Sequence, residues 1–180
     1  AARHGCFRVR LTAFGFGSSC VDGFCSDETA CSTGHDCRAR HGGGACVAGR
    51  CVDELPSGPA GACFLYEPDT IPTTKLIGEG APLLVGGMWL LDVDFSPPIT
   101  AATQLAVREI NDVGGITGGQ PLGMVNCGWN NTDLSGDARA AQIHAVVDYL
   151  AGTLGVPFIV GPLTSGDSQV AIQYLLGKRY

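Results

Sequence analysis

Apolar and polar residues follow each other along the second half of the chain in a pattern that predicts alternating strands and helices. Residues 76–91 are mostly apolar and hold a first strand, at 76–81 or at 83–91, since periodicity alone does not choose between the two. Residues 121–130 and 156–160 are two further apolar runs of strand length. The segments that follow these runs carry apolar residues at helical spacing instead.

The first of these segments predicts a helix that begins near Ser96, with Pro97 in its first turn, and ends at Gly114-Gly115. A second helix is predicted over 135–152, and a third after residue 163. Strands that alternate with helices at this spacing indicate an α/β fold, a parallel sheet with helices packed on its faces. The right-handed crossover rule then places the carboxyl ends of all three strands at one edge, where open α/β sheets bind ligands.

The turn after the third strand, Leu163 to Ser168, is rich in hydroxyl groups and contains no Lys, Arg or His. A helix that begins near Ser165 or Asp167 presents unsatisfied backbone N–H groups and a partial positive charge. Together with the hydroxyl groups, these N–H groups suit a carboxylate or another small polar group. The simpler interpretation is that Ser165 or Asp167 only caps the helix. The turn has no phosphate-loop motif, so we do not expect nucleotide binding.

Cysteine divides the chain into two regions. Eight of the nine cysteines lie within the first 63 residues, and Cys127 is the exception. This density predicts a disulfide-stapled module over 20–63, in an oxidising compartment. Its expected disulfide cysteines are Cys20, Cys25, Cys31, Cys37, Cys46, Cys51 and Cys63, in a pairing that the sequence leaves open. Cys127 pairs with Cys63 or stays a buried thiol.

We expect four segments in all. Residues 1–19 form an N-terminal leader, residues 64–75 a linker rich in proline, and residues 76–180 an α/β lobe. The leader has a basic flank before Cys20, so a signal sequence with a lipid anchor on that cysteine stays open as an alternative. A metal cluster of Cys31, His35, Cys37, His41 and Cys46 is the other alternative, but the cysteine spacings do not match those of zinc sites. We therefore expect no metal and no cofactor.

Charge excludes two classes of partner. Residues 1–51 hold six basic and four acidic groups, whereas residues 52–180 hold five basic and thirteen acidic groups. An acidic surface repels phosphate backbones and anionic lipid heads, so we expect no nucleic acid and no membrane contact apart from a lipid anchor. Asp92 and Asp94 form the clearest carboxylate pair, but no nucleophile and base accompany them, so we expect no enzyme.

Two segments resemble a known family. "AVREINDVGGITGGQPLGMV", residues 106–125, resembles the helix end and second strand of type I periplasmic binding proteins, in the branch that binds amino acids for ABC transporters. "GVPFIVGPLTSGDSQVA", residues 155–171, is similar to that family's third strand and the turn after it. The cysteine-rich segment 31–52 also looks like leaders that precede such domains in exported bacterial proteins.

The resemblance implies a Rossmann-like, incomplete periplasmic-binding lobe, one half of a two-lobed protein, so we expect the sequence to be a fragment. It also implies that Thr164 and Ser165 hold the carboxylate of a small amino-acid-like ligand, assisted by Leu163 and Gly166. The loop after the first strand, around Val85–Trp89 and including Gly86, is expected to form the other wall of the cleft.

These observations lead to two functional hypotheses. The first is a periplasmic or extracellular solute-binding protein that delivers a small polar, amino-acid-like ligand to an ABC transporter permease or a sensor. The second is an extracellular interaction or adhesion protein in which the cysteine-rich module binds the partner and the α/β lobe is a scaffold.

Overall fold

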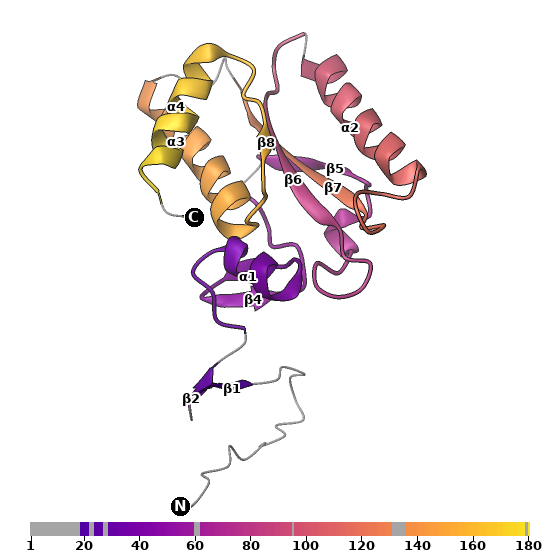
Figure 1. Cartoon of the computed structure of the whole chain (residues 1–180). Helices are drawn as coiled ribbons and strands as arrows, with labels where there is room; N and C mark the ends of the chain where they lie inside the picture. The colour runs from indigo at the N-terminus through magenta and orange to yellow at the C-terminus, as the bar shows by residue number, and fades with distance from the viewer. Residues whose placement is uncertain are drawn as a thin grey trace, which may run out of the picture.

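The computed structural model describes Ser19–Val21, Phe24–Ser26 and residues 29–59, 62–94, 96–130, 136–178 and 180. The leader therefore lies almost entirely outside the described residues, and so do Cys6 and the side chains of Cys20 and Cys25. The fold is mixed α/β, with a small disulfide-rich region ahead of a layered unit (Figure 1).

The layered unit is built on a four-stranded sheet with the order β5-β7-β6-β8. β6 (Leu83–Leu90) is parallel to both of its neighbours, β7 (Leu122–Trp129) and β8 (Ile159–Val160). β5 (Cys63–Glu67) is antiparallel to β7 and forms one edge. The sheet is thus mixed, and the expectation of an all-parallel sheet is wrong because β5 adds an antiparallel edge strand.

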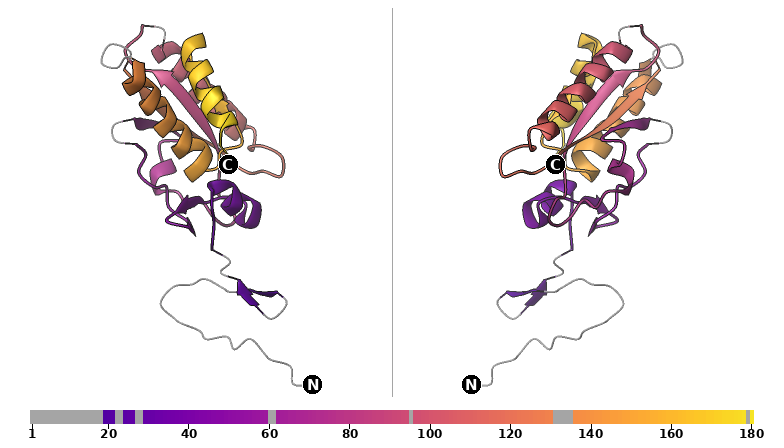
Figure 2. Two further views of the ribbon diagram at one scale, coloured as in Figure 1. Left: turned by 90° about the vertical axis from the view of Figure 1, so that its left-hand side faces the viewer. Right: turned by 90° about the vertical axis from the view of Figure 1, so that its right-hand side faces the viewer.

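Helices cover both faces of this sheet (Figure 2). α2 (Ser96–Asp112) lies on one face, and α3 (Gly136–Val147) and α4 (Ser165–Leu176) lie on the other. A π-helical turn, η2 (Asp148–Thr153), continues α3. Every residue of β7 is buried, which explains why its sequence is apolar at every position but Asn126 instead of alternating. Of the two positions predicted for the first strand, the later one is confirmed.

The range 64–75 differs from the linker that its composition predicts. It supplies most of β5 and a 3₁₀ turn, η1 (Ile71–Thr73), whose Ile71 is buried in the core. A disulfide between Cys63 and Cys127 joins β5 to β7, so the cross-link and the ladder together hold this segment against the sheet. The pairing of Cys127 with Cys63 is the first of the two alternatives that the sequence left open.

The disulfide-rich region contains very short elements. They are β1 (Ser19–Val21), β2 (Phe24–Ser26), α1 (Gly34–His41), β3 (Ala45–Val47) and β4 (Arg50–Val52). β1 and β2 form a hairpin in which the backbones of Cys20 and Cys25 pair, and β3 and β4 form another. Two disulfides, Cys31–Cys46 and Cys37–Cys51, tie α1 and the segment just before it to the second hairpin.

Two glycines join this region to the layered unit. Gly34 opens α1, and a Cβ added to it would lie 2.4 Å from the carbonyl carbon of Leu154. Gly155, with a φ of +61°, meets it from the other side, where an added Cβ would lie 2.2 Å from the carbonyl carbon of Gly34. The two backbones therefore touch directly, and no side chain larger than hydrogen fits at either position.

Candidate functional site

The carboxyl ends of β6, β7 and β8 meet at one edge of the sheet because the three strands are parallel. From β6 the chain turns to α2 on one face, and from the adjacent β8 it turns to α4 on the opposite face (Figure 1). In open α/β sheets, ligands bind where neighbouring strands send their connections to opposite faces. The turn 161–164 lies at this point.

The turn is held tightly against β6. Gly161 has a φ of +100°, and a Cβ added to it would lie 2.2 Å from the carbonyl oxygen of Met88, so only glycine fits there. Leu163 then packs against the apolar cluster on the α2 side of the sheet. The backbone that follows is thereby fixed before α4 begins, without help from a charged side chain in the turn itself.

Thr164 caps α4. Its backbone is extended, with φ −106° and ψ 148°, and its Oγ1 accepts a hydrogen bond from the Asp167 amide at 3.2 Å. The cap is therefore Thr164, and the simpler prediction that Ser165 or Asp167 caps the helix is wrong. Ser165 and Gly166 occupy the first two helical positions, are exposed, and carry amides that helix geometry leaves without an intrahelical acceptor.

Asp167 is the charged group nearest to this helix end, and its charge is balanced. Arg139, from the first turn of α3, donates from Nε to Asp167 Oδ1 at 2.7 Å and from Nη2 to Oδ2 at 2.6 Å. The Asp167 side chain is 5% exposed and that of Arg139 21%. The hydrogen bond from Arg139 to Asp167 raises the pKa of the guanidinium, burial opposes this, and the charges of Asp167 and Asp92 add to the rise.

Sequence reasoning did not find this ion pair because its partners are 28 residues apart and lie on different helices. The available signal was a single arginine near the start of the predicted second helix, at the same sheet edge as the turn. The pair matters for the site because an unbalanced Asp167 carboxylate in the first turn of α4 would repel an anionic ligand.

Gly86 and Trp89 lie elsewhere. Residues 85–89 belong to β6 itself, so the expected loop around them is wrong, and the connection after β6 starts at Leu91. A Cβ on Gly86 would meet Leu150 of η2 at 2.9 Å, inside the core. The Trp89 indole is buried and donates from Nε1 to Asn126 Oδ1 at 2.6 Å. The structure thus brings Leu163, Thr164, Ser165 and Gly166 together. Trp89 belongs to the apolar cluster that Leu163 packs against but is buried there, and Gly86 faces the core.

The other candidates have structural partners or lie at the surface. Asp92 and Asp94 are exposed in the connection after β6. The Sγ atoms of Cys31, Cys37 and Cys51 lie within 4.8 Å of one another, but all three belong to disulfides and are not thiolate ligands. Among the described residues, no helix is both long and apolar enough to cross a bilayer. The three disulfides among the described residues fit a protein of extracellular type.

Chemically, the start of α4 is suited to an anion of small size. It offers two exposed amides, the Ser165 hydroxyl and the positive end of the helix, next to an acidic side chain that is already neutralised. Comparisons of the chain with protein-family models, with curated proteins and with solved structures find no match.

Proposed function

We propose that the layered unit is a Rossmann-like, periplasmic-binding-type lobe that captures a small amino-acid-like ligand through its carboxylate. The observation that carries the proposal is the position of the α4 N-terminus. It lies at the carboxyl edge of the sheet, beside the strand whose connection leaves for the opposite face, and its first-turn carboxylate is paired with Arg139.

The backbone amides and hydroxyl groups at the start of α4 favour the binding of a carboxylate. Amides and hydroxyls that are oriented by a fixed turn stabilise a small anion without the cost of desolvating a lysine or arginine. Arg139 acts as a positioning residue, because its two hydrogen bonds hold Asp167 inside the helix end and leave Ser165 and Gly166 facing outward. A ligand amino group then lies toward the connection after β6, which carries Asp92 and Asp94.

The setting that we propose is the delivery of such a ligand to an ABC transporter permease or a sensor from the periplasm or the cell exterior. The disulfides support an oxidising compartment of this kind.

Two substitutions of one residue test the ligand site. Ser165 is the first helical position and follows an extended residue, so proline is tolerated there while it removes both the amide donor and the hydroxyl. Ser165→Ala removes only the hydroxyl. We expect calorimetric titration of the 180-residue chain with a panel of amino acids to show binding of at least one. Ser165→Ala should weaken that binding several-fold, and Ser165→Pro by about tenfold or more, since hydrogen bonds to a charged group contribute about 1.5–3 kcal/mol.

The matched ligand control is the carboxamide of the same amino acid, which has no carboxylate and should bind neither the wild type nor the variants. Absence of binding across the panel would contradict the proposal. So would equal affinity of the Ser165→Pro variant and the wild type.

A further inference from the structure

β5 forms an open edge of the sheet on the side away from the candidate ligand site. It pairs with β7 on one side, and no other strand of the described part of the chain pairs with its outer side. An exposed edge strand presents a row of backbone N–H and C=O groups that a second extended chain can pair with. β8, the opposite edge, has only two residues in the ladder and offers much less.

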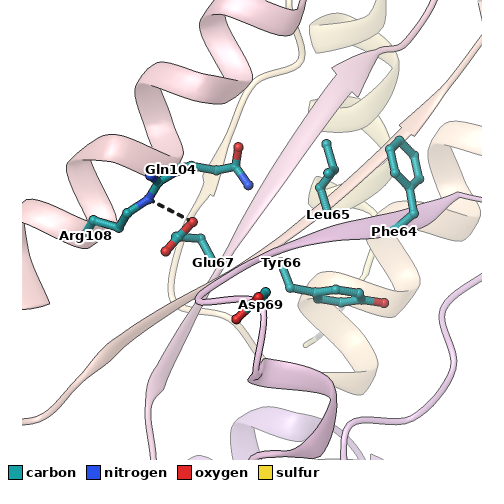
Figure 3. A pocket seen from close by; sticks show the side chains of 7 residues that line it. All are labelled: Phe64, Leu65, Tyr66, Glu67, Asp69, Gln104 and Arg108. Atoms are coloured by element: carbon teal, nitrogen blue, oxygen red, sulfur yellow. Dashed lines mark ion pairs between the residues drawn. The ribbon is translucent and has the colours of Figure 1, made fainter.

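A groove runs between this edge and α2. It has a volume of about 640 Å³ and is lined by residues of β5, the turn after it and α2: Phe64, Leu65, Tyr66, Glu67, Asp69, Gln104 and Arg108. Figure 3 shows Gln104 and Arg108 extending from α2 toward the strand, with Leu65 and Phe64 on the facing wall. The groove therefore combines a free strand edge with a helix alongside it.

Apolar side chains dominate one part of the groove. Phe64 is 46% exposed and Leu65 36%, although both belong to a strand of a well-packed sheet. They adjoin a register shift between Cys63 and Leu65 in the pairing with β7. Exposed apolar side chains beside an open strand edge are typical of surfaces that bind an extended peptide.

Charge distinguishes the other part of the groove. Arg108 Nε lies 3.1 Å from Glu67 Oε2, so these two charges balance each other. Asp69 is exposed and adds a further carboxylate, and residues 52–180 carry thirteen acidic against five basic groups. An occupant of this groove is therefore favoured if it carries basic side chains.

We propose that the groove between β5 and α2 binds an extended peptide segment of a partner protein that carries alternating apolar and basic side chains. The segment pairs with the outer edge of β5 as a fifth strand, its apolar side chains contact Phe64 and Leu65, and a basic side chain lies near Asp69. A second copy of this chain is a poor occupant, because its β5 carries no basic side chain and residues 52–180 of both copies are acidic. The Cys63–Cys127 disulfide holds β5 to the sheet, so the edge is preorganised for pairing.

The test uses the full chain and synthetic octapeptides that are capped at both ends. The first peptide alternates valine with lysine, and the second alternates valine with glutamate. Two further peptides are lysine peptides N-methylated on every valine or on every lysine, which removes the amide donors of one strand edge or the other. Fluorescence anisotropy measures binding, and hydrogen exchange measured by mass spectrometry reports the amides of β5.

We expect the lysine peptide to bind at least tenfold more tightly than the glutamate peptide and to slow exchange in β5. One of the two N-methylated peptides should lose binding while the other keeps it, since only one edge of the added strand pairs with β5. Asp69→Lys, a substitution of an exposed residue, should remove or reverse the preference for lysine. Asp94→Lys makes the same charge change at the carboxyl edge and should leave the preference intact.

Three results would overturn the proposal: no binding of any peptide, equal binding of both N-methylated peptides, or equal effects of Asp69→Lys and Asp94→Lys. Slow exchange of β5 without peptide, together with a concentration-dependent dimer, would assign the edge to a second copy instead. The Ser165→Pro variant should bind the lysine peptide like the wild type, so failure here is distinguishable from failure of the ligand-binding proposal.

Discussion

The disulfide-rich region and the layered unit reach a stable structure by different means. In residues 29–52, strands of three residues and a helix of eight surround an interior whose buried side chains include Cys37, Ala45 and Cys51. The layered unit instead buries long apolar side chains on both faces of its sheet, among them Trp89, Ile143 and Leu150. Cross-links offset the conformational entropy of folding in the first region, and apolar burial offsets it in the second.

The Cys63–Cys127 disulfide of the layered unit differs from the disulfides of the disulfide-rich region in the elements that it joins. Cys63–Cys127 joins strands that are already paired in the ladder and packed against the core, so it adds stability without defining the fold. Cys31–Cys46 and Cys37–Cys51 join elements too short to be stable alone. We therefore expect loss of Cys63–Cys127 to lower the free energy of unfolding more, and loss of a disulfide in the disulfide-rich region to disturb more of the local structure.

The largest expected effect on stability comes from removing Cys63–Cys127. The bond closes a loop of sequence separation 64, and the chain-entropy relation predicts a loss of about 4 kcal/mol in the double variant Cys63→Ala/Cys127→Ala. Denaturant unfolding followed by circular dichroism measures this loss. We expect one cooperative transition at a lower midpoint and an unchanged native helix signal. A broad, non-cooperative transition would show that the bond defines the sheet after all.

Removal of Cys37–Cys51 should have a smaller energetic effect but a larger local one. Its sequence separation is 14, for which the same relation predicts about 3 kcal/mol in Cys37→Ala/Cys51→Ala. We expect amide exchange to become fast across residues 34–52 while β6 and β7 keep their protection. Protection that persists in α1 and β4 would mean that burial, and not the cross-link, holds this region together.

The same contrast explains which parts of the fold the sequence predicts. β6, β7, α2 and α3 follow from apolar runs and helical spacing, which are local signals of buried elements. β5 does not, because its short run lies in proline-rich surroundings and becomes a strand only through its pairing with β7, a segment far along the chain. The choice among cysteine pairings is likewise a property of the folded chain.

The candidate site likewise contains residues that a local pattern predicts and residues that only the packing of the folded chain brings together. Leu163 to Gly166 are contiguous, so one turn brings them together and the sequence predicts it. The pairing of Arg139 with Asp167 depends on how α3 and α4 pack, and no local pattern encodes that. The family resemblance places Trp89 in a loop after the first strand, but the register with β7 extends β6 to Leu90, and the indole is buried.

The smallest expected effect, and the most specific, concerns the joint between the two regions. Alanine has a higher helix propensity than glycine, so Gly34→Ala at the start of α1 should be neutral or stabilising if the region stood alone. The added Cβ would instead lie 2.4 Å from both the carbonyl carbon of Leu154 and the carbonyl oxygen of Thr153, which are backbone atoms that cannot rotate away. We expect a loss of about 1–3 kcal/mol in the free energy of unfolding, the usual cost of overpacking.

Hydrogen exchange should locate that loss. In Gly34→Ala we expect faster exchange in both α1 and η2, the two elements that touch at the joint, with both disulfides of the region still formed. Gly166→Ala is the matched control, because a Cβ there meets no atom within 4 Å and the helix should gain slightly. If Gly34→Ala were as stable as the wild type, the backbones would not be in contact. The disulfide-rich region would then be held to the layered unit by its other contacts, such as those of Ala45 and Val52 with the main apolar core, and not by the backbones of Gly34 and Gly155.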